Sequence, residues 1–335
     1  MQAFKTLAGL GLTLAALYQP TANALVKGAD VSWMTQMEAA GYRFYNDAGT
    51  KQDLLPILKA HGLNAVRLRV WVNPTDGWNN ITDVIAKAKR AKAYGFDILI
   101  DFHYSDSWAD PGQQTKPTAW SSASFDTLMY NVWHFTYDSL TALKNAGITP
   151  KWVQVGNETN NGMLWPDGKA STNMQHFAWL INSGYDAVKA VNSSTKVIVH
   201  LANCENNDLF RWMFDGLTDN GAKWDVIGAS IYPTQSGGGD WFTLDNLCFD
   251  NLSDMATRYD KEVMIVEVGM PWDDATNSYA TINDLLNKMN YIPNSKGLGV
   301  FYWEPESYSN WQGYSLGAFD NSGKPTTALD AFLKY

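Results

Sequence analysis

The chain has 335 residues, of which 45% are apolar and 13% aromatic, and this is enough to bury one large core or two smaller ones. Its formal net charge is −9 and no basic patch interrupts it, so nucleic acid and acidic membrane lipid are not expected as partners. No linker-like tract, charge run or internal repeat divides the chain, and we therefore expect one domain.

The first 24 residues have the pattern of a secretory signal peptide. Lys5 supplies a positive charge, residues 7–17 form an apolar stretch, and an A-x-A cleavage site follows at residues 22–24. No second apolar run is long enough to span a bilayer. We therefore expect a secreted protein, extracellular or periplasmic, with no membrane partner and with its domain at residues 25–335.

Eight β-strands that alternate with helices are expected in that domain. The strand signal is a run of apolar or alternating residues rich in β-branched and aromatic types. Such runs cover residues 26–33, 65–71, 97–104, 151–158, 196–203, 225–232, 262–269 and 299–306. Helical signals lie at residues 53–61, 81–94, 125–146, 174–191, 207–217, 242–259, 279–289 and 326–333. The alternation predicts an α/β fold with a single (β/α)8 TIM barrel.

Polar and aromatic residues gather at the carboxyl ends of the expected strands. Active sites of (β/α)8 barrels lie at that end, whereas chance placement would leave a mixture of Val, Leu and Ala. The strand-end residues are Asp30, Trp33, Arg67, Arg69, Asp101, His103, Tyr104, Asn157, Glu158, His200, Asn203, Tyr232, Glu267, Trp303 and Glu304.

Glu158 and Glu267 are the candidate catalytic pair. Each ends an expected buried strand, the fourth and the seventh, where an unpaired carboxylate is costly. The structural alternative is that each forms an ion pair with Arg67 or Arg69. Two carboxyl groups facing each other across a barrel mouth match glycoside hydrolysis better, because that reaction needs one acid for the leaving oxygen and one carboxylate to attack or to activate water.

Arg67 and Arg69 lie two residues apart and therefore on the same side of the second strand. We expect one of them to face the barrel interior beside Glu267, because a guanidinium keeps a nucleophilic carboxylate ionised. Glu158 would need the opposite treatment as a general acid, namely a raised pKa from burial and from the nearby charge of Glu267.

Five blocks of the sequence resemble the family 53 endo-β-1,4-galactanases, within the clan of retaining (β/α)8 glycosidases. The blocks are residues 28–33, 66–74, 101–111, 155–158 and 301–305, on the first four strands and the eighth. The resemblance implies an endo-acting hydrolase of β-1,4-galactan, as found in type I arabinogalactan and pectin side chains, with Glu158 as acid/base and Glu267 as nucleophile. It also implies that Arg67 lies beside the nucleophile and that Asn157 binds the 2-hydroxyl of the sugar. Around the reacting sugar it places His103, His200, Tyr232 and Trp303. We add the strand-end acids Asp30 and Glu304 to these substrate-binding candidates.

The two-glutamate arrangement does not identify the sugar. An endo-mannanase or endo-cellulase on the same fold is one alternative, and a non-catalytic carbohydrate-binding barrel is another, although both glutamates are present. The expected partner is a polysaccharide, bound by a monomer through rings that stack on sugar faces. Candidate rings in strand-end loops are Trp71, Trp108, Trp120, Trp165, Trp272 and Trp311.

No metal or other cofactor is expected to be required, because the five histidines form no HExxH motif or comparable cluster. A structural calcium held by Asp273, Asp274 and Asn277 is conceivable, but a solvated loop is the preferred interpretation. Cys204 and Cys248 can form a disulfide in an exported protein, and two buried free thiols fit the sequence equally well.

Overall fold

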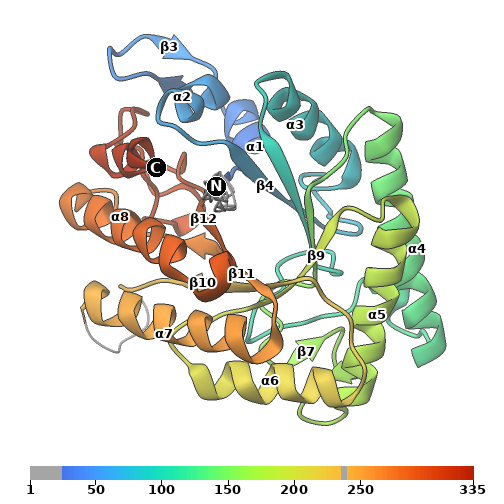
Figure 1. The fold of residues 1–335 in the computed structure, drawn as a ribbon. Coiled ribbons are helices and arrows are strands. Elements are labelled where there is room, and N and C mark those ends of the chain that lie inside the picture. Colours follow the sequence, from blue (N-terminus) through green and yellow to red (C-terminus); the bar gives the residue numbers. More distant parts are fainter. Residues whose placement is uncertain (1–24, 235–239) are drawn as a thin grey trace, which may run out of the picture.

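The computed structural model describes residues 25–234 and 240–335, which form a closed barrel of parallel strands wrapped by helices (Figure 1). The signal-peptide prediction for residues 1–24 falls outside the described residues. Eight barrel strands overlap the eight predicted runs, so the (β/α)8 prediction is confirmed. In chain order they are β1 (Val26–Asp30), β4 (Ala65–Val70), β5 (Asp97–Phe102), β6 (Trp152–Val155), β9 (Lys196–Leu201), β10 (Val226–Ile231), β11 (Glu262–Val268) and β12 (Gly297–Trp303).

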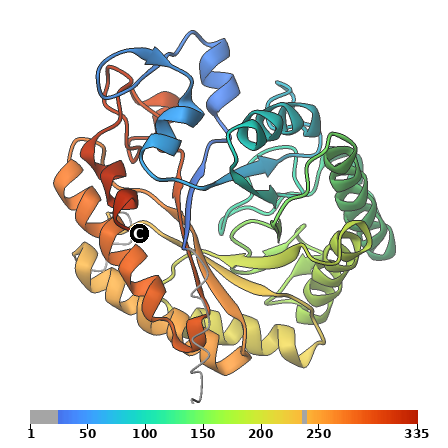
Figure 2. The ribbon, with the colours of Figure 1, turned by 45° about the horizontal axis from the view of Figure 1, so that its top comes forward.

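Each barrel strand pairs in parallel with its neighbours in the chain, and β1 closes the barrel on β12. Helices form the outer wall, as Figure 2 shows from a second direction. They are α1 (Met34–Ala39), α2 (Leu54–Ala60), α3 (Ile81–Ala93), α4 (Phe125–Asn145), α5 (Met174–Val191), α6 (Asn207–Asp219), α7 (Trp241–Tyr259) and α8 (Ala275–Tyr291). Short pairs of two-residue strands, β2 (Phe44–Tyr45) with β3 (Lys51–Gln52) and β7 (Gly162–Met163) with β8 (Gly168–Lys169), are too short to have a sequence period.

The helices begin where the sequence offers capping side chains. From α2 to α8 an Asp, Asn or Ser precedes the first turn, and its side chain accepts a hydrogen bond from a backbone N–H of that turn. The helix predicted at residues 326–333 is instead a 3-10 segment, η4 (Thr327–Lys334). Its Thr326 cap makes no side-chain hydrogen bond, and apolar packing of Ala328, Leu329 and Phe332 holds it in place.

Several strands end earlier than predicted because the backbone turns into the left-handed region. Gly156 and Glu158 have φ values of 87° and 45°, and β6 stops at Val155. Tyr104 after β5 and Glu304 after β12 have φ values of 50° and 45°. A positive φ ends the hydrogen-bonded ladder. Tyr104, Glu158 and Glu304 therefore lie on short turns beyond the strand ends, whereas Arg67 and Glu267 lie on the strands themselves.

The barrel interior changes character along its axis. At the amino ends of the strands a compact apolar cluster includes Val26, Leu99, Trp152 and Phe301. The Phe301 ring occupies the space beside Gly28, where an added Cβ would lie 2.2 Å from it. We call this cluster the apolar plug. Above it, the barrel interior is polar and contains buried charged side chains. The larger apolar core lies between the sheet and the helices.

Cys204 and Cys248 form a disulfide that ties the segment after β9 to α7, across 44 residues of sequence. The free-thiol alternative is therefore wrong. Within the described ranges, 25–234 and 240–335, the structure has no helix with the length and apolar character needed to cross a membrane.

A buried acid between α7 and α8 predicts a stabilising substitution. Asp245 is fully buried, and among the described residues no donor reaches either of its carboxyl oxygens. Burial and the neighbouring Asp284 raise its pKa to about 9. The free energy of unfolding therefore falls as the pH rises from the unfolded-state pKa of the carboxyl towards 9, by on the order of a few kcal/mol. We expect Asp245→Asn to raise Tm at pH 7 by at least about 2 °C.

The gain should shrink towards pH 4, because the pH then approaches the unfolded pKa of about 3.9 and a large share of the unfolded chains also carry the protonated carboxyl. Thermal unfolding at both pH values measures it. Asp250→Asn, at an exposed position of the same helix, is the matched control and should leave Tm nearly unchanged. An equal change in Tm at pH 4 and pH 7 would contradict the proposed cause.

Candidate active site

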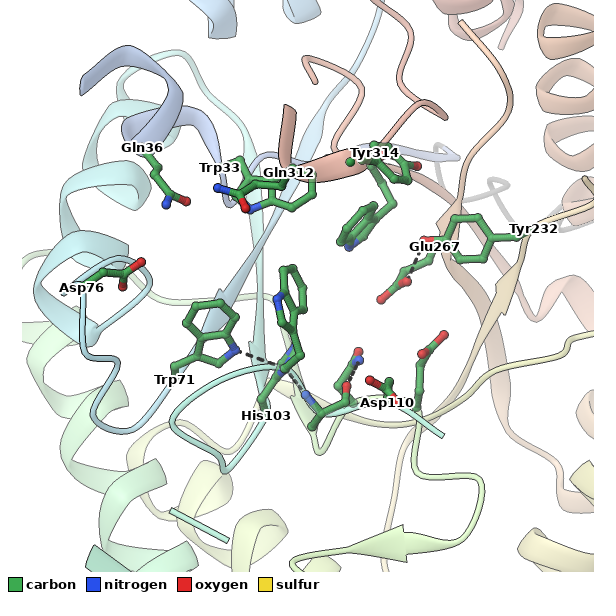
Figure 3. Close-up of a pocket in the computed structure, with 16 residues that line it drawn as sticks. Trp33, Gln36, Trp71, Asp76, His103, Asp110, Tyr232, Glu267, Gln312 and Tyr314 are labelled. Atoms are coloured by element: carbon green, nitrogen blue, oxygen red, sulfur yellow. Dashed lines mark hydrogen bonds between the residues drawn. The ribbon is translucent and has the colours of Figure 1, made fainter. Parts of the chain in front are cut away.

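A cleft of about 480 Å³ opens at the carboxyl ends of the barrel strands (Figure 3). Residues from the end of β11 and from the segments after β1, β4, β5, β6, β10 and β12 line it, so distant parts of the chain meet there. Its lining combines carboxyl groups with tryptophan rings. The lining residues are Trp33, Gln36, Trp71, Asp76, His103, Trp108, Ala109, Asp110, Asn157, Glu158, Tyr232, Glu267, Trp303, Gln312, Gly313 and Tyr314.

Glu158 and Glu267 both line this cleft, as their strand-end positions predict. Glu158 lies on the turn after β6. Glu267 lies near the end of β11, where the pairing with β10 shifts by one residue, so that Ala229 pairs with Ile265 but Ser230 with Glu267. An irregularity of this kind re-aims a side chain. It turns Glu267 into the barrel.

Arg67 on β4 organises the polar interior. It is 1% exposed, and its guanidinium contacts three carboxylates: Asp30 at 2.6 Å, Asp101 at 2.9 Å and Glu267 at 2.8 Å. It also donates to Gln154 and to Asn157, each at 2.8 Å. Burial alone would lower the pKa of Arg67, but the three carboxylates raise it. Arg67 therefore remains a cation beside Glu267.

Glu267 carries two hydrogen-bonding partners that favour its charged form. Arg67 binds Oε1, and the Tyr232 hydroxyl donates to Oε2 at 2.8 Å, a contact drawn in Figure 3. Burial and the negative charges of Asp101 and Asp30 raise the pKa of Glu267 above its usual value, although Arg67 and Tyr232 act in the opposite direction. Of the two cleft glutamates, Glu267 is therefore the better stabilised as a carboxylate.

Glu158 has the opposite environment. Burial and the charge of Glu267 raise its pKa to about 8, and only Ser230 and Arg67 act in the other direction among its main influences. Within the described part of the chain, Glu158 forms no ion pair. Of the two cleft glutamates, Glu158 is therefore the one that holds a proton more readily, because Glu267 has the guanidinium and hydroxyl donors.

His103 connects the cleft wall to the Arg67 network. Its Nε2 lies 3.0 Å from Asp101 Oδ2, while its Nδ1 accepts from the Trp71 indole N–H at 3.3 Å and from the Ala109 backbone N–H at 3.1 Å. Both partners of Nδ1 are donors, so the ring proton lies on Nε2 and points to Asp101. His103 thereby fixes the position of Trp71.

Arg69 and Glu304 form a second buried ion pair. It lies beneath the aromatic wall, by which we mean the cleft-lining tryptophans Trp33, Trp71, Trp108 and Trp303. Arg69 Nη1 lies 2.7 Å from Glu304 Oε1, and the Trp33 backbone N–H donates to Glu304 Oε2 at 3.0 Å. Burial raises the pKa of Glu304 to about 7 although Arg69 lowers it. The guanidinium carbon of Arg69 lies 4.3 Å from the ring centre of Trp108 and 5.3 Å from that of Trp71.

The residues predicted from the sequence divide into two groups. Glu158, Glu267, His103, Asn157, Tyr232 and Trp303 line the cleft. Asp30, Arg67, His200 and Glu304 lie behind it, buried and bonded to lining residues or to each other. Of the candidate rings, Trp71 and Trp108 line the cleft, and Trp120, Trp165, Trp272 and Trp311 do not.

The sequence did not single out the polar lining residues Gln36, Asp76, Asp110, Gln312 and Tyr314, and Ala109 and Gly313 complete the lining. Gln36 belongs to a short helix and Gln312 and Tyr314 to an irregular segment, so none has a strand-end signal. Asp110 lies in the block of residues 101–111, which was the available clue.

The acidic segment after β11 contains a helix cap. Asp274 accepts from the Asn277 backbone N–H and from its side chain, at 3.3 and 2.7 Å. In the ranges that the structure describes, no three His, Cys, Asp or Glu residues are grouped so that they could hold a metal ion.

Comparison with known proteins places this geometry in a family. The model of glycosyl hydrolase family 53 matches residues 26–332. An arabinogalactan endo-β-1,4-galactanase of Humicola insolens is 37% identical, with 91% of this chain and 98% of the relative covered. One of Thermothelomyces thermophilus is 35% identical, with 92% and 98% covered.

Solved structures agree with this result. A structure from a study of two fungal β-1,4-galactanases has a TM-score of 0.86 and 34% identity, and the match covers 93% of this chain and all of that one. The family 53 catalytic domain of Ignisphaera aggregans has a TM-score of 0.83 and 32% identity, covering 92% and 95%. The sequence match over nearly the whole described chain and the common fold show that this protein belongs to glycosyl hydrolase family 53.

Proposed function

We propose that the protein is an endo-β-1,4-galactanase that cleaves galactan by a retaining double displacement. The observation that carries this proposal is the pair of cleft carboxyls, Glu158 and Glu267, which have different surroundings: Arg67 and Tyr232 bind both oxygens of Glu267, whereas burial and the charge of Glu267 raise the pKa of Glu158 to about 8. The named activity of the Humicola insolens and Thermothelomyces thermophilus relatives supports galactan as the substrate.

In the first step the Glu267 carboxylate attacks the anomeric carbon of the bound sugar. The bond to the leaving glycosidic oxygen breaks, and Glu158 gives its proton to that oxygen. A pKa of about 8 keeps Glu158 protonated at neutral pH, ready for this transfer. Arg67 and Tyr232 hold both oxygens of Glu267, so they fix its attacking direction and take up its charge.

In the second step water attacks the anomeric carbon of the glycosyl–Glu267 ester. Glu158, now a carboxylate, takes the proton from that water, and the ester bond to Glu267 breaks. Both residues return to their starting protonation states. The cycle needs only these two side chains and water, and we propose that no cofactor takes part.

The shape of the cleft supports galactan over a flat ribbon. In β-1,4-galactan each O4 is axial, so successive sugars turn, whereas the equatorial O4 of cellulose and mannan gives straight chains. The cleft tryptophans stand at large angles to one another: 82° between Trp71 and Trp108, 80° between Trp33 and Trp108, and 66° between Trp33 and Trp303. Rings at such angles can stack on sugars that turn along a coiled chain.

Export to an oxidising compartment fits the same proposal, because galactan lies outside the cell. The pattern at residues 1–24 predicts a signal peptide, and the Cys204–Cys248 disulfide is typical of extracellular or periplasmic proteins. We propose that the secreted protein acts as a monomer, since both glutamates and the Arg67 and Tyr232 donors that hold Glu267 belong to the same chain and need no residue from a second copy.

Substitution of the two glutamates should give different results. Glu267→Ala should abolish turnover of galactan and of aryl galactosides, because no other group can form the ester. Glu158→Ala should lower kcat/KM on galactan by about 10²–10⁴-fold but keep activity on aryl galactosides whose leaving group needs no proton. Glu262→Ala, on the same strand β11 but outside the cleft, is the control. Galactan hydrolysis at the wild-type rate by either active-site variant would refute the assignment.

The double displacement predicts retention of anomeric configuration. Proton NMR of the first product formed from galactan should show the β-anomer before mutarotation. Initial appearance of the α-anomer would mean that water attacks directly and that Glu267 acts as a base.

The sugar specificity is tested with a panel of polysaccharides. We expect reducing ends to be released from β-1,4-galactan orders of magnitude faster than from mannan, xylan or cellulose, and short oligomers to react more slowly than long ones because remote rings orient the chain. Faster release from mannan or cellulose would overturn the galactan assignment and leave the two-carboxylate mechanism standing. Binding without hydrolysis of any glycan would instead favour a carbohydrate-binding barrel.

A further inference from the structure

Ser230 is a buried hydroxyl beside the catalytic pair that neither the sequence pattern nor the cleft lining singles out. It lies on β10, is 1% exposed, and stands opposite Glu267 in the strand register. Tyr232, two positions further along the chain and just after β10, binds Glu267. Ser230 contacts the other side of the site: its Oγ lies 2.6 Å from His200 Nε2, and its hydroxyl acts as a hydrogen-bonding neighbour that lowers the pKa of Glu158.

The contacts of His200 determine which of its ring nitrogens carries the proton. Nδ1 lies 3.0 Å from the Gln154 Nε2 amide and 3.3 Å from the Glu158 backbone N–H, and both of these groups donate. Asn157 Oδ1 also lies 3.0 Å from Nδ1, and this oxygen already accepts a hydrogen bond from the Arg67 guanidinium. Nδ1 is therefore the unprotonated nitrogen. Burial and the Arg67 charge hold the pKa of His200 well below its usual value, so the ring is neutral.

The neutral ring must then carry its proton on Nε2, which lies 2.6 Å from Ser230 Oγ. His200 donates to the Ser230 oxygen. The Ser230 hydroxyl is thus the acceptor in this hydrogen bond, and its own hydrogen is not used in it. The single hydrogen of Ser230 is left to point at its other partner, the Glu158 carboxyl. The chain of donors therefore runs in one direction, from His200 through Ser230 to Glu158.

We infer that Ser230, oriented by neutral His200, is a positioning residue that stabilises the Glu158 carboxylate formed when the acid has given its proton to the leaving sugar. This inference rests on the acid/base role proposed for Glu158. A hydroxyl donor favours the charged form of its partner and contributes little to the protonated form. Ser230 thus acts when proton transfer occurs, and most strongly for a leaving group that requires a proton.

Other charged groups also act on Glu158, and a Ser230 substitution leaves them in place. Glu267 on β11 and Asp110 after β5 raise the Glu158 pKa, and Arg67 on β4 lowers it. Tyr232 after β10 and His200 on β9 face the site as neutral groups. A change of the Glu158 pKa in a Ser230 variant therefore reports the loss of this one donor.

The test compares Ser230→Ala with the wild-type protein and with Ser230→Thr, which keeps the hydroxyl. In Ser230→Ala, we expect kcat/KM on the natural glycan to fall about 10–100-fold, while an aryl glycoside with a good leaving group changes less than about threefold. The alkaline limb of the kcat/KM profile should move to higher pH, and carbon-13 NMR of labelled Glu carboxyls should show the same rise in the Glu158 pKa. Ser230→Thr should restore both.

Ser183→Ala, a hydroxyl on the outer helix α5 that bonds the Trp179 carbonyl, is the matched control. Ser230→Gly provides a second variant without the hydroxyl if the alanine variant does not fold. Equal losses on both substrates, or an unmoved Glu158 pKa in a folded variant, would overturn the inference. The comparison uses whichever β-1,4-glycan the wild-type protein cleaves, so a wrong sugar assignment would not affect it, and the NMR titration requires no turnover.

Discussion

The buried guanidinium of Arg67 is the constraint on which the rest of the site depends. A cation removed from water is tolerated only with charged or hydrogen-bonding partners around it, and loss of one partner leaves an uncompensated charge. Here the partners come from separate strands: Asp30 from β1, Asp101 from β5 and Glu267 from β11. The ion pairs therefore join opposite sides of the barrel above the apolar plug. The interaction that holds the upper interior together also places the nucleophile.

The presence of one cation among several carboxylates determines which carboxyl group of the site is protonated most readily. Arg67 compensates part of the charge of Asp30, Asp101 and Glu267, and Glu158 lies beyond its direct contacts. The remaining negative charge is removed by protonation at the site with the weakest support, which is Glu158. The acid and the nucleophile thus differ because they share one guanidinium unequally, while burial and the charge of Glu267 raise the pKa of Glu158.

The sequence predicts the barrel well because its strands are buried on both faces and read as apolar runs. It also predicts Glu158 and Glu267, since an acid at the end of such a run is unusual. It does not reveal where the strands stop. The left-handed turns occur at Tyr104, Glu158 and Glu304, and Tyr and Glu, unlike Gly or Asn, are not residue types that indicate a positive φ. Nor does it separate the cleft wall from the layer behind it. Asp30 and Glu304 have the same strand-end signal as Glu267, and only the packing shows that Arg67 and Arg69 cover them.

The aromatic wall and the catalytic carboxylate belong to one bonded network. Trp71 donates to His103, His103 donates to Asp101, and Asp101 and Glu267 bind the same Arg67 nitrogen. A sugar stacked on Trp71 therefore contacts the first member of a chain that ends at the nucleophile. Each link is buried and directional, so a shift of the ring cannot be absorbed by solvent rearrangement. In this arrangement, binding of the glycan chain along the tryptophans and alignment of Glu267 depend on the same set of hydrogen bonds.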